Sequence, residues 1–192
     1  MKYLVALAAG VALTACEPVI VPTGEVLPFS QVLAETKDRP FECIDYDPAT
    51  DSCEAIGTTV RRGPVFISDM QVAVYAAPLV IATVRARARS DKQGRLCTTG
   101  QDLSVNVVGM SDPNASRFIQ DVMRAEIDRV GGVCVIYTRA GHDYVLVSVS
   151  TDGRALPDGP SRTTFFAAPK ALRSANEKEA GRGTCPPRRW CP

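Results

Sequence analysis

Histidine and tryptophan each occur once in this chain of 192 residues, as His142 and Trp190. A serine nucleophile needs a histidine base, so any such chemistry would have to use His142. No serine lies in a G-x-S-x-G or S-x-x-K motif. No C-x-x-C pair is present, and a single histidine leaves too few of the usual zinc ligands. We therefore predict no catalytic residue, no metal site and no cofactor, and we expect His142 in an exposed turn.

The chain also lacks an excess of charge of either sign. Its 22 Lys and Arg residues nearly balance its 21 Asp and Glu residues. Without Lys2, which belongs to an N-terminal apolar segment, the count becomes 21 of each. Proteins that bind nucleic acid generally need a large positive excess, so we predict no nucleic-acid partner.

An uncharged, mostly apolar run covers residues 3–13. A helix of about 15 residues would reach about 22 Å, which is shorter than the ~30 Å hydrocarbon core of a bilayer. A membrane-spanning helix is therefore not expected here. The layout of one positive charge followed by a short apolar run is typical of a cleaved signal peptide, which we place at residues 1–15.

The run ends in Leu13-Thr14-Ala15-Cys16. These four residues resemble the lipobox of bacterial lipoproteins. The resemblance implies cleavage before Cys16 and lipidation of this cysteine, usually with three acyl chains, and two or more chains anchor a protein stably. Glu17 follows where inner-membrane lipoproteins of enteric bacteria tend to have Asp, which favours the outer membrane, with the domain facing the periplasm. The alternative is an ordinary secretory signal with a chance cysteine at this position.

Composition divides the rest of the chain into three parts. Residues 16–40 contain four prolines and little periodicity, so we predict a tether there. Residues 41–169 hold nearly all the periodic hydrophobicity and predict a single globular domain. Residues 170–192 are polar and rich in Gly and Pro, which predicts a mobile tail.

Within the domain, alternating hydrophobicity and turn residues predict antiparallel strands. We expect them over residues 42–46, 53–56, 65–75, 79–89, 103–107, 133–138, 144–150 and 163–168. One amphipathic helix is expected at about 112–130, ending at the Gly131-Gly132 pair. Arg124 and Asp128, four residues apart on its polar side, would pair with each other. The predicted fold class is α+β: an antiparallel sheet of several strands with one helix, braced by disulfides.

Six cysteines remain if Cys16 is lipidated: Cys43, Cys53, Cys97, Cys134, Cys185 and Cys191. An even number in an oxidising compartment predicts three disulfides, and the fifteen connectivities stay open. We favour two local bridges, Cys43–Cys53 and Cys185–Cys191, which leave Cys97–Cys134 as the long-range bridge. Asp45, Asp47 and Asp51 resemble a calcium loop only superficially, since an EF-hand needs glycine at the position of Thr50.

Arginines occupy alternate positions 85, 87 and 89 of an expected strand. Alternation would place the three side chains on one face, about 7 Å apart. Such a stripe could bind an anionic partner such as phospholipid head groups, lipopolysaccharide or an acidic protein. The alternative is a solvent face on which Arg85, Arg87 and Arg89 pair with acids of a neighbouring strand.

Arg188, Arg189 and Trp190 lie between Cys185 and Cys191. A disulfide would close them into a small ring that displays residue types favoured at binding hot spots. The alternative is a tail closed only to protect two thiols.

The sequence as a whole predicts a membrane-anchored envelope lipoprotein that acts as a non-enzymatic binding or assembly module. Its partner would be an envelope protein or an anionic envelope component. The first alternative is a periplasmic enzyme that acts on cell-wall material through His142 or a pair of carboxylates. A small-ligand carrier with a closed apolar cavity is another.

Overall fold

The computed structural model describes residues 24–76, 79–109, 112 and 114–173. Most of them form β-strands, namely β1 (Val26–Leu27), β2 (Phe41–Ile44), β3 (Ser52–Cys53), β4 (Ala55–Arg62), β5 (Val65–Ala76), β6 (Leu79–Ser90), β7 (Leu96–Thr98), β8 (Leu103–Val108), β9 (Val133–Ala140), β10 (Asp143–Ser150), β11 (Ala155–Phe166) and β12 (Ala171–Leu172). The helical elements are α1 (Phe29–Glu35), the 3-10 turn η1 (Gly100–Asp102) and α2 (Ala115–Arg129).

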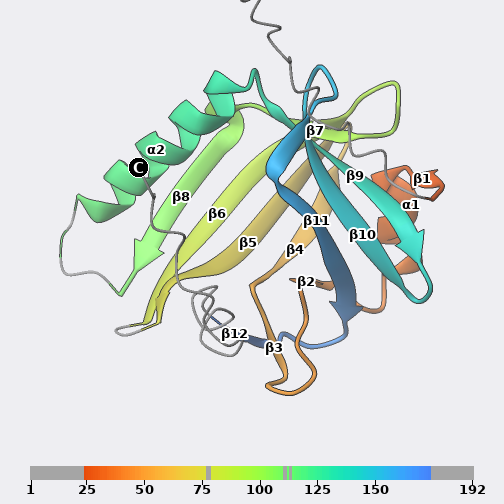
Figure 1. Cartoon of the computed structure of the whole chain (residues 1–192), viewed down its shortest axis with the longest axis horizontal. Coiled ribbons are helices and arrows are strands. Elements are labelled where there is room, and N and C mark those ends of the chain that lie inside the picture. Colours follow the sequence, from red (N-terminus) through yellow and green to blue (C-terminus); the bar gives the residue numbers. More distant parts are fainter. Residues whose placement is uncertain (1–23, 77–78, 110–111, 113, 174–192) are drawn as a thin grey trace, which may run out of the picture.

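Eight strands form a closed antiparallel barrel in the order β9-β10-β11-β2-β4-β5-β6-β7, and β7 pairs back onto β9 (Figure 1). The prediction of an α+β fold, in which an antiparallel sheet of several strands carries one helix, is therefore wrong. The closing strand β7 has only three residues, too few to produce alternation. The first half of β11 contains Pro157 and Pro160 and lies before the strand expected over residues 163–168.

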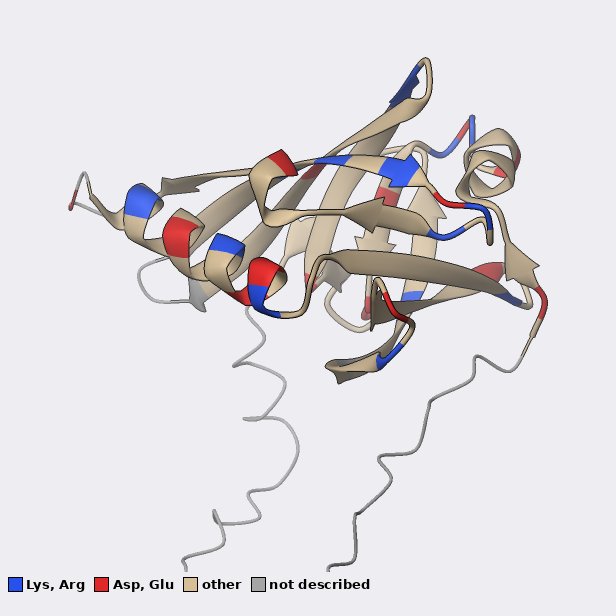
Figure 2. Ribbon diagram, turned by 90° about the horizontal axis from the view of Figure 1, so that it is seen from above, with Lys and Arg blue, Asp and Glu red and all other residues tan. Residues whose placement is uncertain are grey.

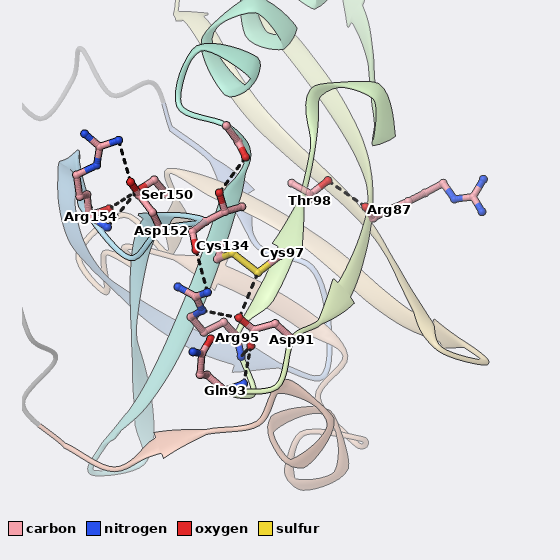
Figure 3. Close-up of a disulfide and its surroundings, with 12 residues drawn as sticks. Arg87, Asp91, Gln93, Arg95, Cys97, Thr98, Cys134, Ser150, Asp152 and Arg154 are labelled. Atoms are coloured by element: carbon pink, nitrogen blue, oxygen red, sulfur yellow. Dashed lines mark hydrogen bonds and ion pairs between the residues drawn. A yellow bond between two sulfur atoms is a disulfide. The ribbon is translucent and has the colours of Figure 1, made fainter.

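A disulfide joins the two strands that close the barrel. Cys97 of β7 faces Cys134 of β9 in the register, and their sulfurs are bonded (Figure 3). The turn before β7 is fixed by Asp91, whose carboxylate accepts hydrogen bonds from the Arg95 side chain at 2.6 Å and the Arg95 amide at 2.9 Å. The second described disulfide joins Cys43 and Cys53, so both favoured pairings within the domain are confirmed.

Helix α1 contributes to the barrel core. Phe29 and Val32 are fully buried among side chains from six barrel strands, and the Phe29 ring lies 5.0 Å from the Tyr137 ring between centroids. The expected tether over residues 16–40 is therefore too long, because β1 and α1 belong to the folded domain. Sequence periodicity missed α1 because its seven residues give only two turns.

A charged side chain at the end of α1 attaches the helix to the barrel wall. Both oxygens of Glu35 accept hydrogen bonds from Arg139 at 2.7 Å, and one accepts a further bond from the Tyr144 hydroxyl at 2.7 Å. These donors, with Gln31, lower the pKa of Glu35 to about 2. The carboxylate therefore stays ionised at a lower pH than a free glutamate would, which keeps the contact with Arg139 in mildly acidic solution.

Strand β8 branches from the barrel, because in the described part of the chain it pairs with β6 alone. Helix α2 lies along its other edge (Figure 1). Three α2 side chains, spaced four residues apart, form hydrogen bonds with the backbone of every second residue of β8. Ser116 Oγ accepts a bond from the Val107 amide at 2.9 Å, and Gln120 Oε1 accepts one from the Val105 amide at 3.1 Å. The Arg124 side chain donates a bond to the Leu103 carbonyl at 2.7 Å.

We call these three side chains the edge ladder. Four helical residues rise about 6 Å and two strand residues about 6.7 Å, so a helix can match the backbone repeat of a strand edge over this length. Asp128 continues the series by accepting a bond from the Gly100 amide at 3.1 Å. Arg124 and Asp128, expected to pair with each other, thus bond to the backbone instead. Exposed strand edges template aggregation, and the edge ladder covers this one.

The C-terminal part of the domain also extends beyond the expected boundary. β12 pairs in parallel with β3, and Arg173 donates a hydrogen bond to the Ser52 carbonyl at 2.7 Å. The predicted tail of residues 170–192 therefore begins too early, and residues 174–192 lie outside the described part. No helix among the described residues is both long and apolar enough to cross a membrane.

Replacing Ser116, Gln120 and Arg124 together by Ala should expose the β8 edge. Each replacement removes a bond worth about 1 kcal/mol, so we expect the free energy of unfolding to fall by about 2–3 kcal/mol and self-association to increase. Urea unfolding and light scattering measure the two effects. The pair Arg117→Ala and Asp121→Ala, at exposed positions of the same helix, should change the stability by less than about 0.5 kcal/mol. Equal behaviour of both variants would show that the edge ladder has no protective role.

Candidate functional site

The outer surface of β4, β5 and β6 carries the arginines that the sequence brings together. Residues of the three strands lie side by side in outward rows: Thr58–Asp69–Arg85, Val60–Ile67–Arg87 and Arg62–Val65–Arg89. Arg62, Arg85, Arg87 and Arg89 are all exposed, as is Val60. We call this surface the outer arginine face.

The arginines on this face differ in their partners. Arg85 forms a two-point ion pair with Asp69 of β5, with N–O distances of 2.8 and 2.9 Å. Within the described residues, Arg87 and Arg89 have no ion-pair partner, because Ile67 and Val65 occupy the facing positions. The Arg87 side chain extends away from the barrel wall (Figure 3). Pairing with a neighbouring strand thus accounts for one arginine of the predicted stripe and leaves two available to a partner.

A groove continues the outer arginine face toward the other end of the strands. It has a volume of about 380 Å³ and is lined by Phe41, Ile56, Gly57, Thr58, Asp69, Gln71, Thr83 and Pro169. Gly57 allows β4 and β5 to approach closely, since a Cβ there would lie 2.1 Å from the Asp69 carbonyl oxygen. Among the described residues, the side chains of Thr58, Gln71 and Thr83 have no hydrogen-bond partner of their own.

A larger hollow of about 630 Å³ lies beside the Cys43–Cys53 disulfide. Asp45 and Asp47 line it together with Arg162 and Arg173. Hydrogen bonds from the Ala49 amide and the Thr50 hydroxyl lower the pKa of Asp47. This carboxyl is held in the ionised form, which suits a base or an ion-pair partner and does not suit a general acid.

Glu42 is an acidic residue inside the barrel. Its side chain is buried on β2, and its Oε1 accepts a hydrogen bond from the Tyr137 hydroxyl at 2.7 Å. Burial raises the pKa of Glu42 to about 7, although the bond from Tyr137 acts in the opposite direction. A perturbed acid often marks an active site, but this one lies within the packed core and is not part of either surface hollow.

Two further features contain residue types that can carry chemistry. His142 is exposed in the turn between β9 and β10, as expected. Asp91, Cys97 and Cys134 lie close enough together to resemble a metal site. However, both sulfurs belong to the disulfide and cannot act as thiolates, and Asp91 is bonded to Arg95.

Several predicted site residues fall outside the described part of the chain. They are the lipidation site Cys16 and the tail residues Cys185, Arg188, Arg189, Trp190 and Cys191. The groove residues Thr58, Gln71 and Thr83 were missed from the sequence because they come from three strands whose register was unknown. Thr83 alone could have been found, since it precedes Arg85 by two residues on the same strand face.

No family model matches the chain, and neither a curated protein nor a solved structure does. A functional assignment therefore has to rest on the residues of the barrel and its surface.

The protonation of Glu42 predicts an unusual pH dependence of stability. Its pKa is about 7 in the folded protein and near 4.5 when unfolded, so the folded state binds the extra proton between these values. The free energy of unfolding should fall as the pH rises from 4.5 through 7, by roughly 3 kcal/mol in total. Glu42→Gln should remove this decrease, as measured by urea unfolding between pH 4.5 and 8. The exposed Glu25→Gln should retain it, and a pH profile of Glu42→Gln that matches the parent would contradict the assignment.

Proposed function

We propose that this protein is a membrane-anchored envelope lipoprotein whose barrel is a non-enzymatic binding module for an anionic envelope partner. The anchor would be the acyl chains on Cys16, at the outer membrane, with the barrel facing the periplasm. The outer arginine face would make the contact. The observation that carries the proposal is that Arg87 and Arg89 lie beside the apolar residues Ile67 and Val65 and have no acid facing them.

The packing of the barrel supports a role at its surface. The interior is occupied by aromatic side chains, and the Phe29 ring contacts the rings of both Phe66 and Tyr137. A carrier would instead need an apolar interior space for its ligand. The two described disulfides suit an oxidising compartment, in agreement with an envelope location.

Acylation tests the anchor. In a bacterial host fed an alkyne-bearing palmitate, the full-length chain should take up the label and sediment with membranes. Cys16→Ser should lose both properties, because it removes the thiol that accepts the lipid. The double variant Cys185→Ser with Cys191→Ser provides the control, since it removes two other cysteines and should be labelled like the parent. Undiminished labelling of Cys16→Ser would refute the anchor.

Binding to a polyanion tests the outer arginine face. Replacing Arg62, Arg87 and Arg89 by Gln should weaken binding to dextran sulfate by about tenfold at low salt, since each exposed ionic contact contributes a fraction of a kcal/mol. The dependence of affinity on salt should also become shallower. Isothermal titration calorimetry measures both.

Arg39, Arg117 and Arg129 form a matched control set, because their replacement by Gln removes the same charge from exposed positions elsewhere. Figure 2 shows that basic and acidic residues alternate along α2, where Arg129 forms an ion pair with Glu126. Equal losses in both triple variants would mean that only net charge matters and would count against a defined binding face.

A further inference from the structure

The groove and the outer arginine face form one continuous surface on β6. Thr83, Arg85, Arg87 and Arg89 follow each other at alternate positions, with their side chains on the same side of the sheet. At 3.3–3.4 Å per residue, they span about 20 Å along the strand. An extended ligand that touches the free arginines would therefore reach the groove as well.

The two ends of this surface differ in chemistry. At one end, Arg87 and Arg89 present positively charged guanidinium groups. The groove presents uncharged hydrogen-bonding groups, namely the hydroxyls of Thr58 and Thr83 and the amide of Gln71, together with the apolar side chains of Phe41 and Ile56. Asp69, the acid in the groove, is already bonded to Arg85, so its charge is compensated and need not repel an anion.

From this arrangement we infer that the partner is an acidic glycan, a sugar chain bearing carboxylate or phosphate groups. Its acidic groups would contact Arg87 and Arg89. A neighbouring sugar ring would occupy the groove. Its hydroxyls would bond to Thr58, Gln71 and Thr83, and its C–H face would pack against Phe41 and Ile56. The groove volume of about 380 Å³ lies within the range of small-ligand sites. The inference rests on the proposed function and specifies the ligand of the same surface.

Two other anionic partners fit this surface less well. A membrane surface is usually bound by large apolar side chains that insert among the lipids, and on this face Val60 is the exposed large hydrophobic residue. A protein interface is usually centred on aromatic anchors, and the aromatic residue lining the groove, Phe41, is only partly exposed. Dispersed hydroxyl and amide groups next to a guanidinium row suit a hydroxylated polyanion better.

Four probes separate these possibilities in titrations with the full-length protein. Polygalacturonate carries carboxylates and hydroxyls, polyglutamate carries carboxylates alone, dextran carries hydroxyls alone, and phosphatidylglycerol vesicles present an anionic lipid surface. At equal carboxylate concentration, polygalacturonate should bind about tenfold tighter than polyglutamate, since several additional hydrogen bonds contribute. Dextran should bind weakly, and the vesicles should bind no tighter than polyglutamate.

The groove is tested by a triple variant with Thr58→Val, Gln71→Met and Thr83→Val, which keeps the side-chain volumes and removes the hydrogen-bonding groups. It should lower polygalacturonate affinity to the level of polyglutamate and leave polyglutamate binding unchanged. The arginine triple variant should weaken both, and circular dichroism confirms that each variant is folded. If either variant fails to fold, single changes at Thr83 and Arg87 provide the same comparison.

The outcomes also separate this inference from the proposed function. Equal affinity for polygalacturonate and polyglutamate, or a groove variant that binds like the parent, would overturn the glycan assignment and leave the basic binding face intact. Tighter binding to the vesicles would identify a lipid surface instead. Absence of binding to every anionic probe would overturn the proposed function itself.

Discussion

The barrel depends on three residue pairs between β7 and β9. These pairs, Leu96–Val135, Cys97–Cys134 and Thr98–Val133, are the link that converts a curved sheet into a closed one. So short a ladder contributes few hydrogen bonds, and the Cys97–Cys134 disulfide lies at its middle pair. The disulfide closes a loop of 37 residues, and in the chain-entropy account a loop of that length contributes roughly 4 kcal/mol by restricting the unfolded chain. The disulfide therefore supplies stability to the closed barrel that three backbone pairs alone would not provide.

Closure of the barrel determines which side chains its interior can accommodate. The aromatic side chains of Phe66, Tyr137 and Phe165 point inward from different strands, and Phe29 of α1 packs among them. The same enclosed space contains Glu42, whose burial favours the protonated form. A neutral acid can share a core with aromatic rings as long as its hydrogen bond with Tyr137 is kept. Because packed side chains fill the interior, the proposed binding surface lies on the outside of the wall, where the arginines are.

The sequence predicts the individual strands better than their arrangement. Alternation located β5, β6, β8, β9 and β10 because each is long and half-buried. It could not show closure, since that depends on three residues of β7 that carry no periodic signal. The first half of β11 was not predicted because it contains Pro157 and Pro160. A strand nevertheless tolerates proline at positions where no backbone hydrogen bond to a neighbouring strand is needed. The charge pattern of α2 was also misinterpreted: the spacing of Arg124 and Asp128 fits an ion pair, yet each bonds to backbone that only the fold brings near.

The candidate site shows the same division between local pattern and long-range register. The common face of Arg85, Arg87 and Arg89 follows from strand alternation alone. Their different environments depend on the residues opposite them in β5, where Asp69 faces the first and apolar residues face the others.

The closing strand also links the disulfide to this surface. Arg89 pairs directly with Cys97 in the register, and the Thr98 hydroxyl donates a hydrogen bond to the Arg87 carbonyl at 3.0 Å. The backbone that carries the two free arginines is thus held from one side by the strand that the disulfide secures. An oxidising environment would then maintain both the closed barrel and the geometry of the outer arginine face, so the proposed binding surface depends on the disulfide that closes the barrel.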